Sequence, residues 1–135
     1  MGLNCQKSLV TLAAQDIELL VNFYQQLLGQ TPITQIPGIY AEFHLPGLHL
    51  GIFQPKTSNQ AEFANSAQSG MSLCLEVRDI EIAIAHLTAI GYPPPGKIAT
   101  ASHGQEIYAY DPEGNRIILH QAKKIKCRLE RSRSV

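Results

Sequence analysis

Two patterns of apolar residues alternate along this chain, and together they predict where its helices and strands lie. Apolar side chains recur at helical spacing after Asp16 as far as Gly29, and again after Asp79 as far as Gly91. Asp is a preferred residue before the first helical turn and Gly just after the last one, so helices are expected between these pairs. Short apolar runs bounded by turn residues predict strands at 8–14, 31–36, 39–45, 48–54, 71–77, 97–101, 105–110 and 115–121.

The two halves of the chain repeat one another. Asp16-Ile17-Glu18 corresponds to Asp79-Ile80-Glu81, and Leu45-Pro46-Gly47 corresponds to Asp111-Pro112-Glu113-Gly114. Such a repeat predicts two βαβββ modules, each with one helix covering one face of its sheet. The expected fold class is therefore α+β, with two modules forming a U-shaped half-barrel around a central cleft. The organisation expected for residues 1–135 is a single domain: module one at 8–54, a linker at 55–70, module two at 71–121 and a basic tail at 122–135.

Composition and charge narrow the classes of protein that this chain can be. No run of about 18 apolar residues is present, so we expect no membrane span. Cys5, Cys74 and Cys127 are widely spaced and odd in number, which favours free thiols and a cytoplasmic location. The tail carries a net charge of +5, so the first 121 residues carry −5. The acidic body argues against a nucleic-acid-binding domain, and the tail is either a solvated terminus or a weak contact for nucleic acid or acidic lipid.

Three motifs together resemble a known superfamily. They are the helix from Asp16 to Gly29, its repeat from Asp79 to Gly91, and the turn Asp111-Pro112-Glu113-Gly114-Asn115-Arg116. Over residues 8–121 the chain resembles the vicinal oxygen chelate superfamily, the glyoxalase, bleomycin resistance protein and dioxygenase fold. The resemblance implies a cleft between paired modules, often completed in a homodimer. In the metal enzymes of that superfamily, His and Glu side chains from four strands hold a divalent ion in the cleft.

The four positions that this resemblance assigns to the metal ligands hold unsuitable residues. Counting from the matched motifs gives Leu9, Gly51, Ser72 and Ile118. None of these is an imidazole, thiolate or carboxylate, the groups that bind zinc and similar ions. We therefore expect no metal and no cofactor, and a protein of the bleomycin-resistance type that binds a small organic molecule without turnover. The alternative is a metal-dependent lyase or dioxygenase of the same superfamily with a displaced site, and a third interpretation is an interaction module acting through the basic tail.

Period-two alternation predicts which side chains share the cleft face with the four positions. The expected ligand-binding residues are Thr11, His49, Phe53, Ser72, Cys74, Glu76, Ile118 and His120. They form an apolar floor with a few polar groups, as small-molecule sites usually have. Tyr40, Glu42 and His44 also alternate on one strand, as do Tyr108 and Tyr110 on another, but the pattern does not say which face is inward.

Four polar residues of this set admit chemical roles beside structural ones. His49, Cys74 and His120 are either a displaced metal site or residues satisfied within the core. Glu76 is a candidate general base with a raised pKa if it is desolvated, or else it pairs with Arg78 or Arg116. Cys74 is either a nucleophile near His120 or an inert buried thiol.

Overall fold

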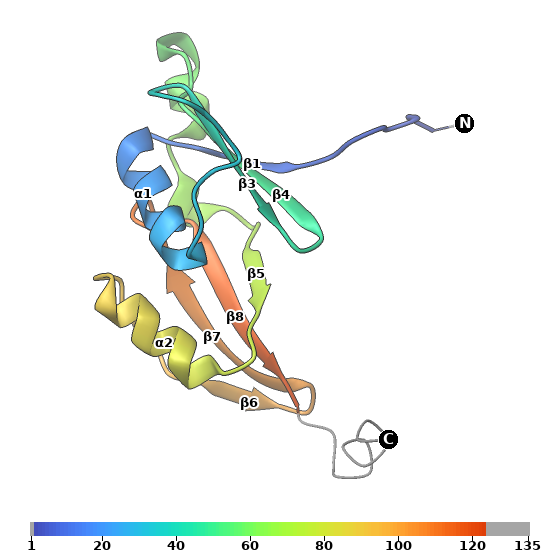
Figure 1. Ribbon diagram of the computed structural model, residues 1–135, viewed down its shortest axis with the longest axis vertical. Coiled ribbons are helices and arrows are strands. Elements are labelled where there is room, and N and C mark those ends of the chain that lie inside the picture. Colours follow the sequence, from blue (N-terminus) through green and yellow to red (C-terminus); the bar gives the residue numbers. More distant parts are fainter. Residues whose placement is uncertain (1, 124–135) are drawn as a thin grey trace. The chain divides into compact units, whose positions relative to one another are not determined.

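The computed structural model describes residues 2–123, which divide into two compact units. Unit 1 contains the residues up to 69 together with 111–115, and unit 2 contains 70–110 and the residues from 116 onward. Each unit is built on one four-stranded mixed sheet with one helix, so the predicted βαβββ modules are confirmed (Figure 1). Most of the basic tail lies outside the described residues.

Unit 1 has the strand order β1-β4-β3-β2. Strand β1 (Val10–Ala13) runs parallel to β4 (Leu48–Phe53), and β3 (Tyr40–Leu45) is antiparallel to both β4 and β2 (Thr34–Ile36). Helix α1 (Ile17–Leu28) begins at Asp16, whose side chain accepts a hydrogen bond from the Leu19 amide, and ends at Gly29 in the left-handed conformation. Both predicted caps of this helix are therefore present.

The core of unit 1 lies between α1 and one face of its sheet. Phe43, Leu50 and Ile52 are fully buried from the sheet side, and Leu20 and Tyr24 are fully buried from the helix side. Burying an aliphatic or aromatic side chain of this size contributes about 1.5–3 kcal/mol, so these residues fix which face of the sheet is covered. The other face of the sheet carries the polar side chains.

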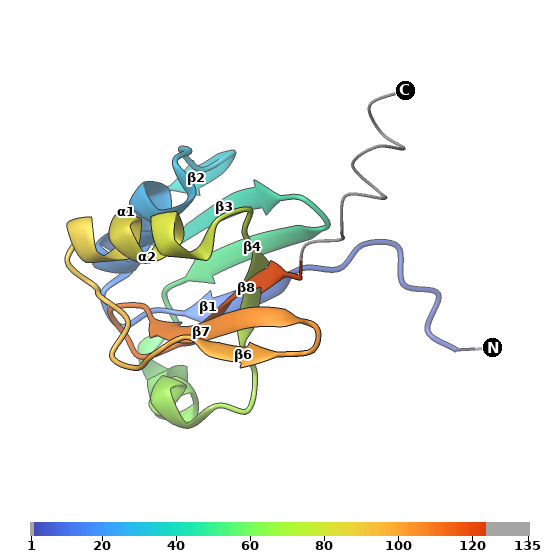
Figure 2. The same ribbon diagram turned by 90° about the horizontal axis from the view of Figure 1, so that it is seen from below.

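Unit 2 repeats this plan with the strand order β5-β8-β7-β6. Its elements are β5 (Leu73–Glu76), α2 (Ile80–Ala89), β6 (Ala99–Ala101), β7 (Gly104–Tyr110) and β8 (Arg116–Ala122). Figure 2 shows β3 and β4 as a hairpin in unit 1, and β6 and β7 as a hairpin in unit 2. Asp79 begins α2 by accepting hydrogen bonds from the Glu81 and Ile82 amides, as its position in the sequence predicts.

The turn Asp111–Asn115 belongs to unit 1, although β7 and β8 on either side of it belong to unit 2. The Tyr24 hydroxyl donates to Asp111 Oδ2 at 2.8 Å, and both residues are buried. The Glu113 carboxylate accepts from the backbone amides of Gln15 and Asp16 at 2.8–2.9 Å, just before α1. A carboxylate is favoured there because the N-terminus of a helix carries unpaired N–H groups and a partial positive charge.

Several elements are shorter or more ordered than the sequence pattern predicts. The strands expected at 8–14, 31–36 and 71–77 pair over only four, three and four residues. The linker expected at 55–70 contains two 3-10 helices, Thr57–Phe63 and Ser66–Gln68. Phe63 packs edge-on against Phe53, with ring centroids 5.4 Å apart, and attaches this segment to the sheet of unit 1. Within the described part of the chain, no helix is long and apolar enough to span a membrane.

Candidate functional site

The face of the unit 1 sheet opposite α1, here called the open face of unit 1, carries its charged and histidine side chains together with Tyr40 and Phe53. Because neighbouring residues on a strand point to opposite faces, the buried positions 41, 43, 50 and 52 direct their neighbours to this face. Its members are Thr11, Tyr40, Glu42, His44, His49, Gly51 and Phe53. Thr11, His49 and Phe53 thus share one face with Gly51, as their alternation predicts.

Glu42 is the centre of this face and is only 8% exposed. Its Oε1 accepts a hydrogen bond from the Tyr40 hydroxyl at 2.6 Å, and its Oε2 lies 2.7 Å from His44 Nε2. These two hydrogen bonds, that from Tyr40 first, lower the pKa of Glu42, so the carboxylate is ionised at neutral pH. Burial and the bond to Glu42 raise the pKa of Tyr40 to about 12.

His49 completes a compact polar cluster with Glu42 and His44. The two imidazole rings stack with centroids 3.7 Å apart and planes 4° from parallel. His49 Nδ1 lies 3.7 Å from Glu42 Oε2, and each of the three residues offers one ligand atom within 4.8 Å of the others. A carboxylate with two imidazoles is a donor set that suits zinc and other first-row transition metals.

Gly51 lies directly across the ladder from Glu42. A Cβ atom built on Gly51 would come within 2.7 Å of the Tyr40 hydroxyl and 3.1 Å of the ring. The space in which a side chain at position 51 would start is therefore filled by Tyr40. The carboxylate on this face of the sheet belongs to Glu42 on the neighbouring strand, and not to a residue at position 51.

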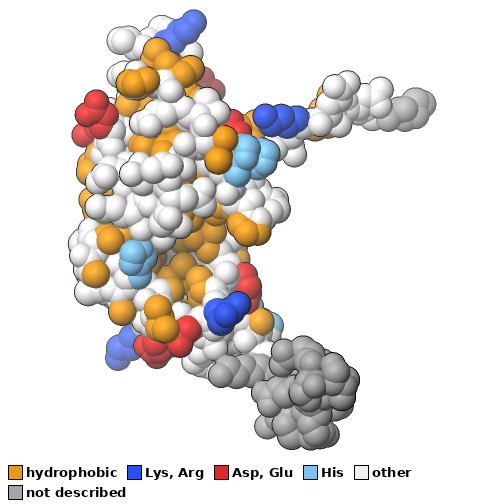
Figure 3. All heavy atoms as spheres, in the orientation of Figure 1, with side chains coloured by type: hydrophobic (Ala, Val, Ile, Leu, Met, Phe, Trp, Pro, Cys, Tyr) orange, Lys and Arg blue, Asp and Glu red, His pale blue; other side chains and the backbone are white. Residues whose placement is uncertain are grey.

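A cavity of about 320 Å³ lies beside His49. Its walls include Lys7, Leu9 and Leu48, so one cation and several apolar side chains face the same space. In the space-filling view, histidine side chains lie over the strands of unit 1, next to a basic and an acidic side chain (Figure 3). The volume is at the lower end of the range of ligand sites, about 300–1,000 Å³.

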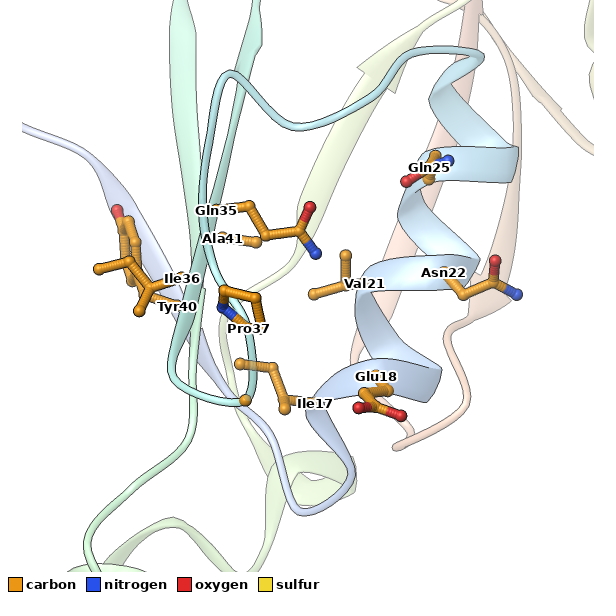
Figure 4. Close-up of a pocket in the computed structure, with 11 residues that line it drawn as sticks. Ile17, Glu18, Val21, Asn22, Gln25, Gln35, Ile36, Pro37, Tyr40 and Ala41 are labelled. Atoms are coloured by element: carbon orange, nitrogen blue, oxygen red, sulfur yellow. The ribbon is translucent and has the colours of Figure 1, made fainter.

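A second cavity, of about 270 Å³, lies on the other side of the same sheet, between α1 and the β2–β3 hairpin. Figure 4 shows Val21 and Ile17 directed into this space, with the amide of Gln35 facing the helix and Tyr40 directed away. The sequence pattern gives no indication of this cavity, because its lining comes from a helix and a turn whose separation depends on packing.

The face of the unit 2 sheet opposite α2, here called the open face of unit 2, holds the other predicted ligand-binding residues. Cys74 pairs across the ladder with Ile118, and Glu76 pairs with His120. Ser72, just before β5, accepts a hydrogen bond from Arg116 at 2.8 Å. All five predicted residues of module two therefore gather on one sheet.

The structure corrects the interpretation of Glu76 as a base with a raised pKa. Glu76 Oε1 lies 2.6 Å from His120 Nδ1, and Oε2 accepts the Ala122 amide at 2.7 Å. The bond with His120, followed by that from Ala122, lowers the pKa of Glu76, whose side chain is 58% exposed. Its partner is His120 in place of the arginines considered from the sequence. His120 Nε2 in turn lies 2.9 Å from His103 Nδ1, in the β6–β7 turn.

Cys74 is poorly suited to nucleophilic attack. Cys74 is exposed, so it is not the buried thiol considered as the alternative. Partial desolvation, followed by the negative charges of Glu76 and Glu106, raises the pKa of its thiol and so disfavours the reactive thiolate. The metal set considered from the sequence, His49 with Cys74 and His120, shares only His49 with the cluster whose ligand atoms converge in the structure.

Sequence reasoning placed Glu42 and His44 on a strand but did not connect them with His49. The signal was available in the tight turn Pro46-Gly47. A two-residue turn between Leu45 and Leu48 sets the register of the hairpin, so His44 must face His49 and Glu42 must face Gly51.

Comparison with known proteins assigns the chain to a family and supports its fold. Solved structures with similar folds include a glyoxalase/bleomycin resistance protein from Catenulispora acidiphila (21% identity, TM-score 0.66, 88% of this chain and 100% of that one). A genomically encoded fosfomycin resistance protein from Listeria monocytogenes has 17% identity and a TM-score of 0.68, covering 90% and 96%. A bleomycin-binding protein complexed with bleomycin has 18% identity and a TM-score of 0.61, covering 88% and 100%.

No curated protein sequence matches this chain. The model of one protein family matches residues 8–119, which is well over half of the chain and almost the whole span over which the sequence motifs indicated a resemblance. The chain therefore belongs to the Glyoxalase/Bleomycin resistance protein/Dioxygenase superfamily.

Proposed function

We propose that this chain binds a small organic molecule without a metal ion at the four strand positions that the superfamily's metal enzymes use. The observation that carries the proposal is the geometry at Gly51, where Tyr40 fills the space that a ligand side chain would need. Leu9, Ser72 and Ile118 at the other three positions supply no imidazole or carboxylate. A similar protein that binds bleomycin supports binding as the activity.

The cavity beside His49 is the part of unit 1 that we propose as the ligand site. It combines the apolar walls of Leu9 and Leu48 with the cation of Lys7 and the imidazole of His49. Apolar walls drive burial of a ligand, and a few polar groups orient it. The ligand expected here is small and largely apolar, with an acceptor or acidic group directed at Lys7. The predicted residues of module two, Ser72, Cys74, Glu76, Ile118 and His120, remain candidates for further contacts.

Thermal unfolding in the presence of EDTA tests this proposal, because EDTA removes any contribution from metal. A panel of small carboxylated aromatic compounds, with bleomycin included, is screened for compounds that raise the melting temperature. A ligand at 100 times its Kd stabilises by about 2.7 kcal/mol, which raises the melting temperature by several degrees. We expect such a compound to lose its effect in Leu9→Asp and to bind at least about tenfold more weakly to Lys7→Ala.

The matched control is Ile82→Asp, at an exposed position on α2 that no proposed ligand contact includes. Unchanged binding to this control, with loss in Leu9→Asp, supports the site. Equal binding to all variants, or stabilisation that disappears whenever EDTA is present, would contradict the proposal.

We also propose a cytoplasmic homodimer, because Cys5 and Cys74 are free thiols and because homodimers are common in this superfamily. Light scattering of the purified chain measures its mass directly.

A metal-dependent lyase or dioxygenase is the second candidate, and the cluster of Glu42, His44 and His49 is the observation that favours it. Such an enzyme would use an ion displaced from the four superfamily positions. Turnover of a glyoxal–thiol adduct or a catechol that is lost in Glu42→Gln would support it.

A further inference from the structure

Glu42, His44 and His49 form a polar cluster of which the organic-ligand proposal uses only His49. They lie on two adjacent strands, β3 and β4, and all project from the open face of unit 1. The three residues are held by one hairpin, so the arrangement does not depend on unit 2 or on the ligand proposed above. His44 and His49 pair directly across the ladder, and Glu42 lies two residues before His44.

One atom in this cluster lacks the partner that its burial requires. His49 Nδ1 is buried from solvent and has no hydrogen-bond partner among the described residues. The nearest acceptor, Glu42 Oε2, is 3.7 Å away, which is too far for a hydrogen bond. A buried nitrogen without a partner destabilises the folded chain, and a cation placed between it and the carboxylate would satisfy both groups.

The carboxylate is oriented for this purpose by Tyr40. The Tyr40 hydroxyl holds Glu42 Oε1 at 2.6 Å and leaves Oε2 directed at both histidines. A hydrogen bond of this kind to a ligand carboxylate is a common feature of metal sites, because it fixes the position of the ligating oxygen. Glu42 is 8% exposed, so little water competes for Oε2.

We propose that Glu42 Oε2, His44 Nε2 and His49 Nδ1 bind a divalent first-row transition metal ion such as Zn²⁺, at a site contained in unit 1. Ligand atoms about 2.0–2.1 Å from a tetrahedral ion lie roughly 3.4 Å apart. The 3.7 Å separation of Glu42 Oε2 from His49 Nδ1 fits this spacing. The 2.7 Å separation of Oε2 from His44 Nε2 is that of a hydrogen bond, and it widens when the ion replaces the shared proton.

The stacked rings must also turn, because the lone pairs of parallel imidazoles do not converge on one ion. His44 and His49 side chains are 38% and 37% exposed, so there is space on the solvent side for one ring to tilt. Three protein ligands leave a fourth position for water or for an organic donor, which is the pattern of reactive and not of structural zinc sites. The ion would therefore not lie at position 51. Its ligands are Glu42, which pairs with Gly51, and the next pair on the same face, His44 and His49.

Unit 2 offers a comparison cluster that should not bind metal. His120 uses Nδ1 for Glu76 and Nε2 for His103, so its two nitrogens point to different partners. Glu76 and His103 lie at opposite nitrogens of the His120 ring, so the three residues do not direct one ligand atom each at a common point. His120→Ala is the matched histidine control.

Titration of the metal-free, tag-free chain with Zn²⁺ against a chromogenic chelator tests the proposal. We expect one ion per chain and a loss of affinity of at least about 100-fold in His49→Ala and in Glu42→Gln, with no change in His120→Ala. Tyr40→Phe, which keeps all three ligands, should weaken binding about tenfold. Co²⁺ in place of Zn²⁺ should give a visible absorption band that His49→Ala lacks.

The stability of each metal-free variant, measured by urea unfolding, shows whether a loss of binding reflects a loss of fold. Absence of stoichiometric binding to the folded native chain would overturn the proposal. Binding that survives both His49→Ala and Glu42→Gln, or that disappears in His120→Ala, would also overturn it. Neither result affects the organic-ligand proposal, whose test is done in EDTA.

Discussion

Gly51 shows how one residue determines the chemistry of its surroundings. Tyr40 crosses the strand where a Cβ atom at position 51 would begin, and its hydroxyl reaches Glu42. We expect Gly51→Ala to push the Tyr40 ring aside and break this hydrogen bond. Because that bond and burial raise the pKa of Tyr40 to about 12, the pKa should fall towards the ordinary value of about 10. The added methyl should also cost about 1–3 kcal/mol of stability through overpacking.

Ultraviolet titration of tyrosinate measures this change, with Tyr40→Phe subtracted to isolate the one phenol. Gly70→Ala is the control, since a Cβ atom there meets nothing within 4 Å and the backbone is not left-handed. A pKa of Tyr40 that stays near 12 in Gly51→Ala would mean that the ring accommodates the methyl without leaving Glu42.

The sequence predicts which face of a sheet a residue occupies better than it predicts that residue's hydrogen-bond partners. Alternation placed Thr11, His49 and Phe53 on the same face as Gly51, because the period of a strand is fixed. It did not show that Glu42 would take both Tyr40 and His44 as partners, because rotamers decide between neighbours that are equally close. Nor did it show that Glu76 would pair with His120 in preference to an arginine.

At the scale of one element, α1 depends on a turn that is distant in sequence. Glu113 accepts the Gln15 and Asp16 amides, which precede the first turn of the helix, while Asp16 itself caps the Leu19 amide. We expect Glu113→Ala to lower the free energy of unfolding by about 1–2 kcal/mol, because two backbone donors lose a charged acceptor. Urea unfolding followed by far-UV circular dichroism measures the loss.

Glu62→Ala is the matched control for this prediction, because Glu62 is exposed in the linker and is not at the start of α1. Its stability should remain within about 0.5 kcal/mol of the native chain. Equal losses in the two variants would show that the effect of Glu113 is one of net charge and not of its position before α1.

Elements with strong local signals were the ones that sequence predicted well. Asp16 and Gly29 bound one helix, and Asp79 with Gly91 marks the other, because caps and left-handed positions depend on nearby residues alone. The 3-10 helices at 57–63 and 66–68 have no apolar period, so the sequence predicts only a linker there. Their order depends partly on Phe63, whose contact with Phe53 is a tertiary one.

At the scale of the whole molecule, the repeat in the sequence predicts two modules but not how residues are shared between the units. Residues 111–115 repeat the turn at 45–47 in sequence, yet they belong to unit 1. The reason is the hydrogen bond from Tyr24 to Asp111, which joins residues 87 positions apart. A pattern of apolar periods carries no information about such a pairing, because both partners are polar at the contact.

This sharing makes a prediction about cooperativity. Asp111–Asn115 is held by unit 1 but lies between β7 and β8 of unit 2, so neither unit should open fully while the other keeps its structure. Leu87→Ala in the core of unit 2 should cost about 2–5 kcal/mol, and Tyr24→Phe in unit 1 about 1.5–3 kcal/mol. In each variant, we expect the hydrogen-exchange protection of the slowest amides to fall equally in β4 and in β8. The fall should match that variant's own loss of stability. The exposed Tyr108→Phe should change neither. If Leu87→Ala instead reduced protection in β8 alone, the two units would be independent in folding, and the turn at 111–115 would act only as a cap for α1.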